Sequence, residues 1–237
     1  MSAEAERGPA LAVFAHPDDA EIAAGGTLAK WAAAGREVRL LVLTNGDRGT
    51  TDPAVDRSEL ARVRAAETIA AAQVLGLAGS RVLDVHDGEL GDTPETRAIV
   101  VRTIRELRPS TIVSCDPTTW FFAQRFVNHA DHRTAGAIAI DSVWPAAGNP
   151  HFFPEHLEEG LAPHDVTELW LAWSDGPDHH EDVTASFATK VAALGEHRSQ
   201  LEVGIRYFEE ELEREARRAG ERIGVPYAES FRVLYLS

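Results

Sequence analysis

The sequence predicts an α/β fold in which a mostly parallel sheet carries helices on both faces. Short apolar runs, typical of buried strands, alternate four times with longer helical patterns within about 115 residues. Polar residues follow the predicted strands, which is where open α/β sheets bind their ligands. We therefore expect a single Rossmann-like domain over residues 1–237, with its active site at the carboxyl ends of the strands.

The first half of the chain supplies most of these strand–helix pairs. Gly35 is placed to end the first helix, Ser58 is the expected N-cap of the second, and Pro94 suits the first turn of the third. Each strand is an apolar run rich in leucine or β-branched residues. The expected strands are 11–15, 37–44, 81–85 and 111–115, and the expected helices are 23–34, 56–76 and 94–107.

The second half is less regular. Residues 1–10 are expected to form a disordered terminus, and residues 144–182 a variable loop region around one strand at 168–173. The remaining elements are helices at 133–143, 183–201 and 203–219, and an edge strand at 230–236. The 203–219 helix could pack on its own sheet or on another subunit, so a homo-oligomer is left open.

Composition restricts the partners. The formal net charge of -15 argues against nucleic acid or an anionic membrane, and favours a small-molecule substrate or a metal. Cys115 is the single cysteine, so no intrachain disulfide forms. The acidic N-terminus shows no secretory signal and no run approaches the ~18 apolar residues of a membrane helix, so we expect a cytoplasmic protein.

The most informative stretch follows the first strand. His16, Asp18, Asp19 and Glu21 come directly after the apolar run, and Pro17 must interrupt the strand. Carboxylates and an imidazole at the end of a buried strand are costly unless they are paired or bound to a cation. The sequence thus indicates a polar site there.

Two pairs have metal-ligand spacing. His16 and Asp19 are three residues apart, as are His129 and His132 at an expected helix start. Two imidazoles and one carboxylate are a common catalytic zinc set with one position open for water. One histidine of the second pair and Asp18 would then be free as acid and base. Spacing alone leaves a solvated histidine pair and an Asp-Asp turn as alternatives.

These motifs resemble those of the LmbE-like, or PIG-L-like, zinc-dependent N-deacetylases, which act on N-acetylglucosamine conjugates in mycothiol, bacillithiol and GPI-anchor synthesis. The most specific match is Ala15-His16-Pro17-Asp18-Asp19-Ala20-Glu21, followed by Gly25-Gly26-Thr27-Leu28. Weaker matches follow in the expected order: Thr44-Asn45-Gly46-Asp47, Arg64-Ala65-Ala66-Glu67, Asp87-Gly88-Glu89-Leu90, His129-Ala130-Asp131-His132 and His197-Arg198-Ser199-Gln200.

The resemblance implies a metal site and a sugar site. His16, Asp19 and His132 would bind Zn²⁺. Arg64 and Asp87 occupy positions that contact sugar hydroxyls in family members, although each also has a structural interpretation, as a solvated helix residue and a turn residue.

It also implies the acid–base groups. Asp18 would be the general base, His129 the general acid or oxyanion stabiliser, and Asp131 the carboxylate that orients one of the histidines. Val127 stands where some members carry a tyrosine that assists the oxyanion, and Ala130 replaces the usual proline.

The expected function is therefore a zinc-dependent hydrolase that removes an acetyl group from an N-acetylated amino sugar or its conjugate. An amidase for another N-acyl natural product or thiol conjugate, and a non-catalytic metal- or sugar-binding domain, are the alternatives. A nucleotide-binding domain is disfavoured because the first turn lacks G-x-G-x-x-G. Selectivity is assigned to residues 117–130 and 144–182, where Trp120, Phe121 and Phe122 are either core residues or a surface on which a sugar stacks.

Overall fold

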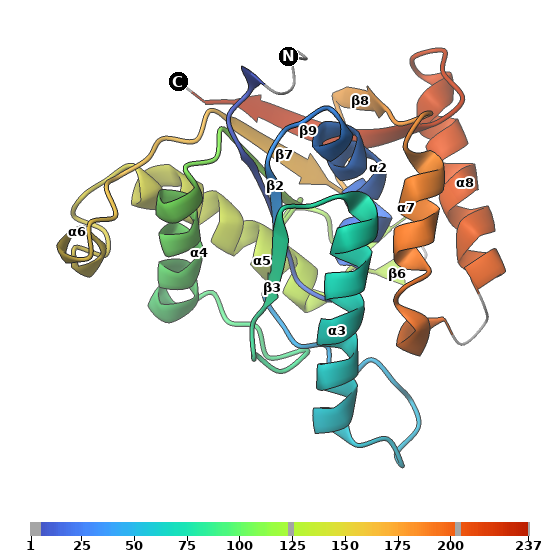
Figure 1. The fold of residues 1–237 in the computed structure, drawn as a ribbon, viewed down its shortest axis with the longest axis horizontal. Coiled ribbons are helices and arrows are strands. Elements are labelled where there is room, and N and C mark those ends of the chain that lie inside the picture. Colours follow the sequence, from blue (N-terminus) through green and yellow to red (C-terminus); the bar gives the residue numbers. More distant parts are fainter. Residues whose placement is uncertain (1–5, 123–125, 202–204, 237) are drawn as a thin grey trace.

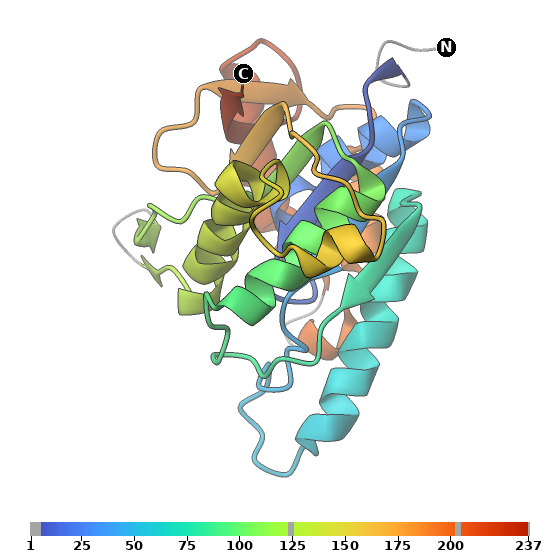
Figure 2. The same cartoon turned by 90° about the vertical axis from the view of Figure 1, so that its left-hand side faces the viewer.

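The computed structural model describes residues 6–122, 126–201 and 205–236, and over these residues it forms a twisted sheet between two layers of helices (Figures 1 and 2). The strands are β1 (Ala10–Phe14), β2 (Val38–Val42), β3 (Gly79–Val82), β4 (Thr111–Cys115), β5 (Phe121–Phe122), β6 (Phe126–Val127), β7 (Glu168–Ala172), β8 (His179–Asp182) and β9 (Ala228–Tyr235). The helices are α2 (Asp19–Ala33), α3 (Arg57–Leu75), α4 (Pro94–Leu107), α5 (Ala130–Asp141), α6 (Glu155–Glu158), α7 (Phe187–Leu194) and α8 (Ile205–Glu221), with shorter turns η1 (Ser142–Ala147) and η2 (Arg198–Gln200).

The strand order of the sheet reverses between β1 and β4. The seven-stranded sheet runs β3-β2-β1-β4-β7-β9-β8. The first five strands pair in parallel, and β9 pairs antiparallel with both β7 and β8. The order reverses at β1, and at such a switch point the connections leave in opposite directions and open a ligand crevice at the carboxyl ends. The predicted mostly parallel α/β sheet is confirmed.

Both faces of the central strands are buried, as their continuous apolar sequences predict. Leu11 and Val13 of β1 pack in one cluster with α4 and α5. Ala12 and Phe14, which point to the opposite face, pack with α2 and its Trp31. Figure 1 shows α4 and α5 on one side of the sheet and α2, α7 and α8 on the other. The core therefore covers both faces of β1.

A buried ion pair anchors the middle of α2. Lys190 Nζ lies 2.6 Å from Glu229 Oε1 and donates to the carbonyl oxygen of Ile22 at 2.8 Å. The Glu229 carboxylate accepts from the backbone N–H groups of Gly26 and Thr27 at 2.9 and 2.8 Å. Since Lys190 lies on α7 and Glu229 on β9, the pair ties α2 to both elements.

Several boundaries in the first half differ from the predicted ones. β1 begins at Ala10, and Gly8 accepts a hydrogen bond from Arg36 at 2.9 Å, so the expected disordered terminus does not extend to these residues; residues 1–5 lie outside the described part. β3 spans Gly79–Val82 rather than 81–85, because β2 ends at Val42, which pairs with Val82. α2 begins at Asp19 rather than residue 23, since carboxylates near a helix N-terminus are stabilised by the helix dipole.

The second half holds elements that were expected as loops. β8 lies within the predicted variable loop region 144–182 and makes β9 an interior strand rather than an edge strand. Its sequence His-His-Glu-Asp is polar because only one of its sides is paired and charged residues protect a sheet edge. The helix expected at 183–201 is shorter, ending at Leu194 and followed by η2.

The last long helix packs within its own chain. Leu212 and Ala216 of α8 join Phe187 and Leu194 in one apolar cluster. The predicted start of this helix, residue 203, lies outside the described residues. None of the helices in the described ranges is long and apolar enough to cross a bilayer.

Candidate metal centre and active site

Three donor groups, two from the turn after β1 and one from α5, lie close together. His132 Nε2 lies 3.2 Å from His16 Nδ1 and 3.2 Å from Asp19 Oδ1, and His16 Nδ1 lies 3.3 Å from Asp19 Oδ2. Ligand atoms held tetrahedrally by bonds of about 2.05 Å are separated by about 3.4 Å. The observed separations therefore fit a small divalent cation bound by two imidazoles and one carboxylate, a set that can hold a metal ion.

The turn after β1 presents two of these donors. Asp18 adopts φ 102°, in the left-handed region that non-glycine residues rarely occupy. This conformation lets Asp19 start α2 and accept a hydrogen bond from the His16 backbone N–H at 2.8 Å. Unusual backbone geometry of this kind concentrates at functional sites.

The electrostatics of the cluster favour a bound cation. Burial opposes ionisation of Asp19, yet His132 and His16 hold its pKa far below the usual range. Burial likewise opposes protonation of His16, but Asp19, Asp131 and Asp87 raise its pKa to about 12. The carboxylates around His16 thus stabilise positive charge strongly, and a metal ion would supply that charge in place of the proton.

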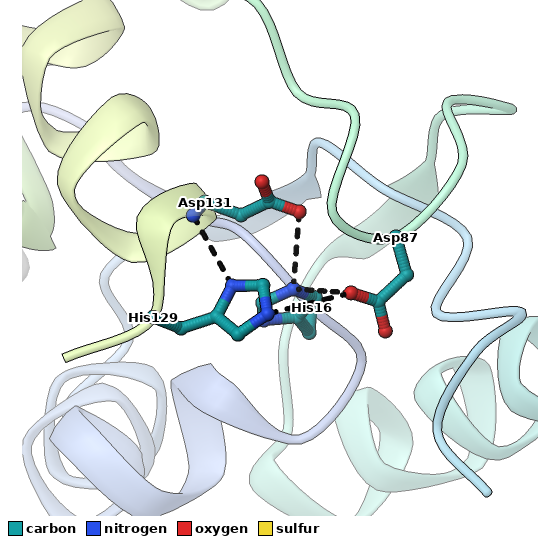
Figure 3. A group of neighbouring side chains, drawn as sticks. All are labelled: His16, Asp87, His129 and Asp131. Atoms are coloured by element: carbon teal, nitrogen blue, oxygen red, sulfur yellow. Dashed lines mark hydrogen bonds and ion pairs between the residues drawn. The ribbon is translucent and has the colours of Figure 1, made fainter. Parts of the chain in front are cut away.

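A second group of side chains surrounds the other nitrogen of His16 (Figure 3). His16 Nε2 lies 3.3 Å from Asp87 Oδ1 and 3.4 Å from Asp131 Oδ2, while His129 Nε2 is 3.8 Å from Asp87. Asp131 also accepts from the Gly88 N–H at 2.7 Å, and its own N–H donates to His129 Nδ1 at 3.1 Å. This group could also hold a cation, but its spacing is wider and the His129 side chain is 44% exposed. The first group is therefore the better metal site.

Asp18 lies beside a buried guanidinium. Arg64 is only 3% exposed, and its Nη2 is 3.3 Å from Asp18 Oδ2. The same guanidinium donates to the carbonyl oxygens of Pro17 at 2.6 Å and Gly46 at 2.9 Å. Burial raises the pKa of Asp18 to about 6, although the charge of Arg64 opposes this. A carboxylate with such a pKa is suited to accept and release protons near neutral pH.

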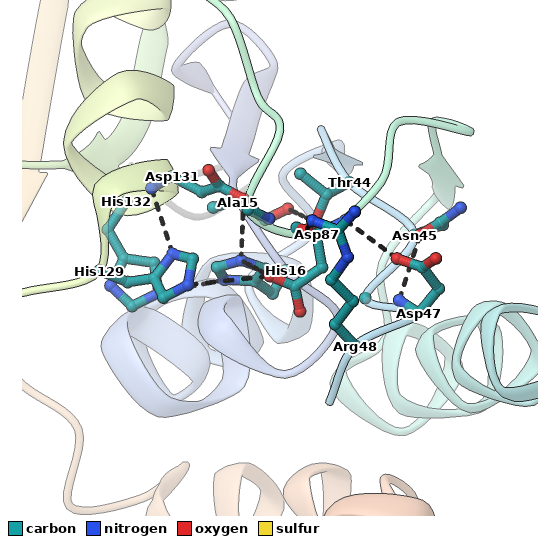
Figure 4. A network of polar contacts seen from close by, with 12 residues as sticks. Ala15, His16, Thr44, Asn45, Asp47, Arg48, Asp87, His129, Asp131 and His132 are labelled. Carbon is teal, nitrogen blue, oxygen red and sulfur yellow. Dashed lines mark hydrogen bonds and ion pairs between the residues drawn. The ribbon is translucent and has the colours of Figure 1, made fainter. Parts of the chain in front are cut away.

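A further polar network fixes the loop that carries Asp87 (Figure 4). Asp47, 1% exposed, accepts from the Asp87 N–H at 3.1 Å and lies 2.9 Å from His86 Nδ1. Arg57 also contacts the Asp47 carboxylate, and Arg48 donates to the Asp87 carbonyl oxygen at 2.6 Å. The loop of residues 44–47, which the sequence marked as a motif, therefore supports Asp87 rather than entering the metal group.

Two contacts to His132 have no counterpart among the predicted site residues. Asn128 Oδ1 is 2.9 Å from His132 Nδ1. The ring of Trp173, which follows β7 and has φ 57°, packs with its centroid 4.9 Å from that of His132. The spacing of four residues between Asn128 and His132 could have indicated that their side chains are in contact. Nothing in the local sequence indicates that Trp173 contacts His132.

The aromatic residues before the histidine pair are not core residues. Trp120 is 56% and Phe121 51% exposed, while Phe122 packs edge-on against Trp173 with centroids 6.2 Å apart. Val127 is also exposed. Stacking of a sugar on Trp120 or Phe121 stays a prediction.

Comparison with known proteins identifies the family. A family model described as "PIG-L: GlcNAc-PI de-N-acetylase" matches residues 11–143. The chain belongs to the PIG-L family. All the site residues predicted above lie within this PIG-L match, from His16 to His132.

Relatives of known name agree with this assignment. The chain is 35% identical to a diacetylchitobiose deacetylase of Thermococcus kodakarensis, with 94% of this chain and 81% of the relative covered. It is 30% identical to a 1D-myo-inositol 2-acetamido-2-deoxy-alpha-D-glucopyranoside deacetylase of Rhodococcus erythropolis, with 86% and 84% covered.

Solved structures show the same PIG-L fold. The N,N'-diacetylchitobiose deacetylase of Pyrococcus horikoshii superposes with a TM-score of 0.89 at 32% identity, over 97% of this chain and 85% of that one. A 4-carboxy-2-hydroxymuconate hydratase of Pseudomonas putida superposes with a TM-score of 0.80 at 20% identity, over 97% of both chains. The hydratase shares the fold alone, so the reaction has to be argued from the site.

Proposed function

We propose that this protein is a zinc-dependent hydrolase that removes the acetyl group from an N-acetylated amino sugar or its conjugate. The observation that carries the proposal is the donor set of His16, Asp19 and His132, whose spacing suits tetrahedral Zn²⁺. Two imidazoles and one carboxylate leave the fourth position open, as catalytic zinc sites require. The 35% identity to a diacetylchitobiose deacetylase supports an N-acetylated amino sugar as the substrate class.

Asp18 is the proposed general base. Zinc, when bound, would act as a Lewis acid, which lowers the pKa of water and polarises an acyl carbonyl. Asp18 then accepts the proton of the attacking water, and Arg64 holds its carboxylate in place. General acid–base assistance of this kind contributes about 100- to 10,000-fold to the rate.

His129 is the proposed donor to the oxyanion. Its Nδ1 accepts the Asp131 N–H, so the proton of the neutral ring is on Nε2, which faces the site. Burial and the charge of His16 lower the pKa of His129, which favours this neutral form. A neutral N–H donor supports the oxyanion role more directly than the role of a cationic acid. Asp131 is proposed to orient His16, since its carboxylate faces His16 Nε2.

The two residues predicted to bind the sugar differ in their support. Asp87 lies at the site, beside His16 and His129, and is proposed to accept a hydrogen bond from a substrate hydroxyl. Arg64 is buried and contacts backbone carbonyls, which supports a role in holding the turn around Asp18. Direct contact between Arg64 and the sugar stays a prediction.

The remaining expectations about partners are also proposals. The net charge of -15 supports a small-molecule substrate without nucleic acid or membrane partners. The buried free Cys115 is compatible with the cytoplasm.

The proposal is tested by metal content and acetate release on one preparation. Wild type and His132→Ala are compared with N-acetylglucosamine and N,N'-diacetylchitobiose as substrates. His151→Ala is a matched control, because this exposed histidine lies in the turn before α6 and outside both metal-binding groups. We expect one zinc per chain and acetate release in wild type and the control, and loss of both in His132→Ala. Wild type that binds no zinc after reconstitution would refute the proposal, and bound zinc without acetate release would direct the search to other N-acyl substrates.

A further inference from the structure

We propose that Asn128 is a positioning residue that fixes His132 in the tautomer able to bind a metal through Nε2. Asn128 is 1% exposed, and its Oδ1 lies 2.9 Å from His132 Nδ1. The inference rests on the proposed function, since it concerns the metal that His132 would hold.

The hydrogen bonds of Asn128 determine the tautomer. Its Nδ2 donates to the carbonyl oxygen of Thr119 at 2.8 Å. A carbonyl oxygen can only accept, so the amide nitrogen must face Thr119 and the amide oxygen must face His132. That oxygen can only accept in turn, so His132 Nδ1 carries the proton. The lone pair of the neutral ring is then on Nε2, the nitrogen 3.2 Å from both other donor groups.

Without Asn128, the His132 tautomer with its proton on Nε2 would become more populated. Asp19 Oδ1 lies 3.2 Å from His132 Nε2 and would favour a proton on that nitrogen, where the metal has to bind. The Trp173 ring covers the imidazole but offers no acceptor that distinguishes its two nitrogens. Asn128 is therefore the residue that counteracts the preference of Asp19 for a proton on His132 Nε2.

Asn128 is itself held by the segments that follow β4 and β7. Its backbone N–H donates to the carbonyl oxygen of Trp120 at 2.9 Å. Thr119 Oγ1 accepts from the Asp175 N–H at 3.2 Å, which attaches the segment after β4 to the segment after β7. These bonds therefore fix the orientation of His132 relative to the segments that follow β4 and β7. His16 and Asp19 follow β1 at the same edge of the sheet.

The test compares zinc affinity in matched variants by competition with a chelator. Asn128→Leu keeps the approximate size but removes the acceptor, and we expect zinc affinity to fall about 10- to 100-fold. Asn128→Asp keeps an acceptor for Nδ1 and is expected to restore most of the affinity. Asn149→Leu is the control, because Asn149 is a partly buried amide whose Oδ1 accepts from the His151 N–H at 2.9 Å and which lies outside both groups that could hold a metal. Unchanged affinity in Asn128→Leu, or an equal loss in Asn149→Leu, would overturn the inference.

A second measurement needs no variant. In the zinc-loaded wild type labelled with ¹⁵N-histidine, long-range imidazole spectra should show His132 with its proton on Nδ1 and zinc on Nε2. The reverse assignment would overturn the role of Asn128 and leave the metal site standing. Wild type that binds no zinc would instead remove the proposed function, and this inference with it, so the two failures are distinguishable.

Discussion

Replacing Lys190 by methionine is expected to destabilise the protein by about 3–5 kcal/mol, the usual cost of removing one partner of a buried ion pair. Methionine keeps the length of the side chain but removes its charge. The Glu229 carboxylate then stays buried against the N–H groups of Gly26 and Thr27 with no cation beside it. The destabilisation should affect α2, the helix that begins with Asp19, because Glu229 bonds to the backbone of this helix.

The magnitude follows from the geometry of the pair. Its N–O separation is 2.6 Å and its side chains are 5% and 4% exposed. At an effective dielectric constant of about 20, two unit charges this close attract by roughly 6 kcal/mol. Desolvation cancels part of this gain in the wild type, but the variant retains the desolvation of Glu229 without the attraction. At about 3 °C per kcal/mol for a chain of this size, the melting temperature should fall by roughly 10 °C.

The assay is thermal and urea unfolding of the metal-free protein, so that metal binding does not add to stability. Lys30→Met is the matched control, because Lys30 pairs with Glu181 at 2.8 Å but its side chain is 39% exposed. Such a pair contributes at most about 1 kcal/mol. In Lys190→Met/Glu229→Gln the loss should be smaller than the sum of the single losses. The reasoning is wrong if Lys190→Met costs no more than Lys30→Met.

Four further outcomes are expected. Asp18→Ala and His129→Ala should each keep bound zinc, but acetate release should fall about 100- to 10,000-fold without the base Asp18 and about 100- to 1,000-fold without the oxyanion donor His129; near-wild-type rates would refute the assigned role. Gly136→Ala should cost about 1–3 kcal/mol in urea unfolding, because the added methyl would collide with the carbonyl oxygen of Cys115; an unchanged midpoint would contradict this. Burial lowers the pKa of His156 below its ordinary value, so wild-type stability should fall as the pH drops below about 6.5, and unfolding curves of His156→Gln should show a smaller fall; equal slopes would exclude His156 as the cause. Zinc at 100 times its dissociation constant should stabilise wild type by about 2.7 kcal/mol, and no shift in melting would mean that it does not bind the folded state selectively.

Much of the fold could be predicted because its signals are local. α4 and β4 occupy the predicted ranges, since Thr93 and Pro94 define the helix start and a continuous apolar run defines the strand. β8 escaped prediction because its four residues are polar, and only its pairing with β9 makes it a strand. The start of α2 was placed too late because Asp18 and Asp19 were assigned to the turn alone.

The grouping of the candidate site residues was predictable where one motif carries two of them. His16 and Asp19 lie in one turn, and the spacing of His129 and His132 indicated the second pair. The long-range contacts were not predictable. Trp173 reaches His132 from the segment after β7, and the burial of Arg64 depends on how the Gly46 loop closes over it. Such contacts depend on the order of the strands in the sheet, which local sequence patterns do not predict.

The meeting of two distant segments at the β1–β4 switch point has a consequence for folding. His16 and Asp19 are more than 100 residues away from His132 along the chain. A bound metal would therefore act as a cross-link, and closing a loop of about 100 residues in the unfolded chain is worth about 4.7 kcal/mol in the chain-entropy model. During synthesis the first two donors emerge early, but the third is positioned only after β4 has paired beside β1. Metal uptake is thus expected to follow assembly of the central sheet, and to report that this assembly is complete.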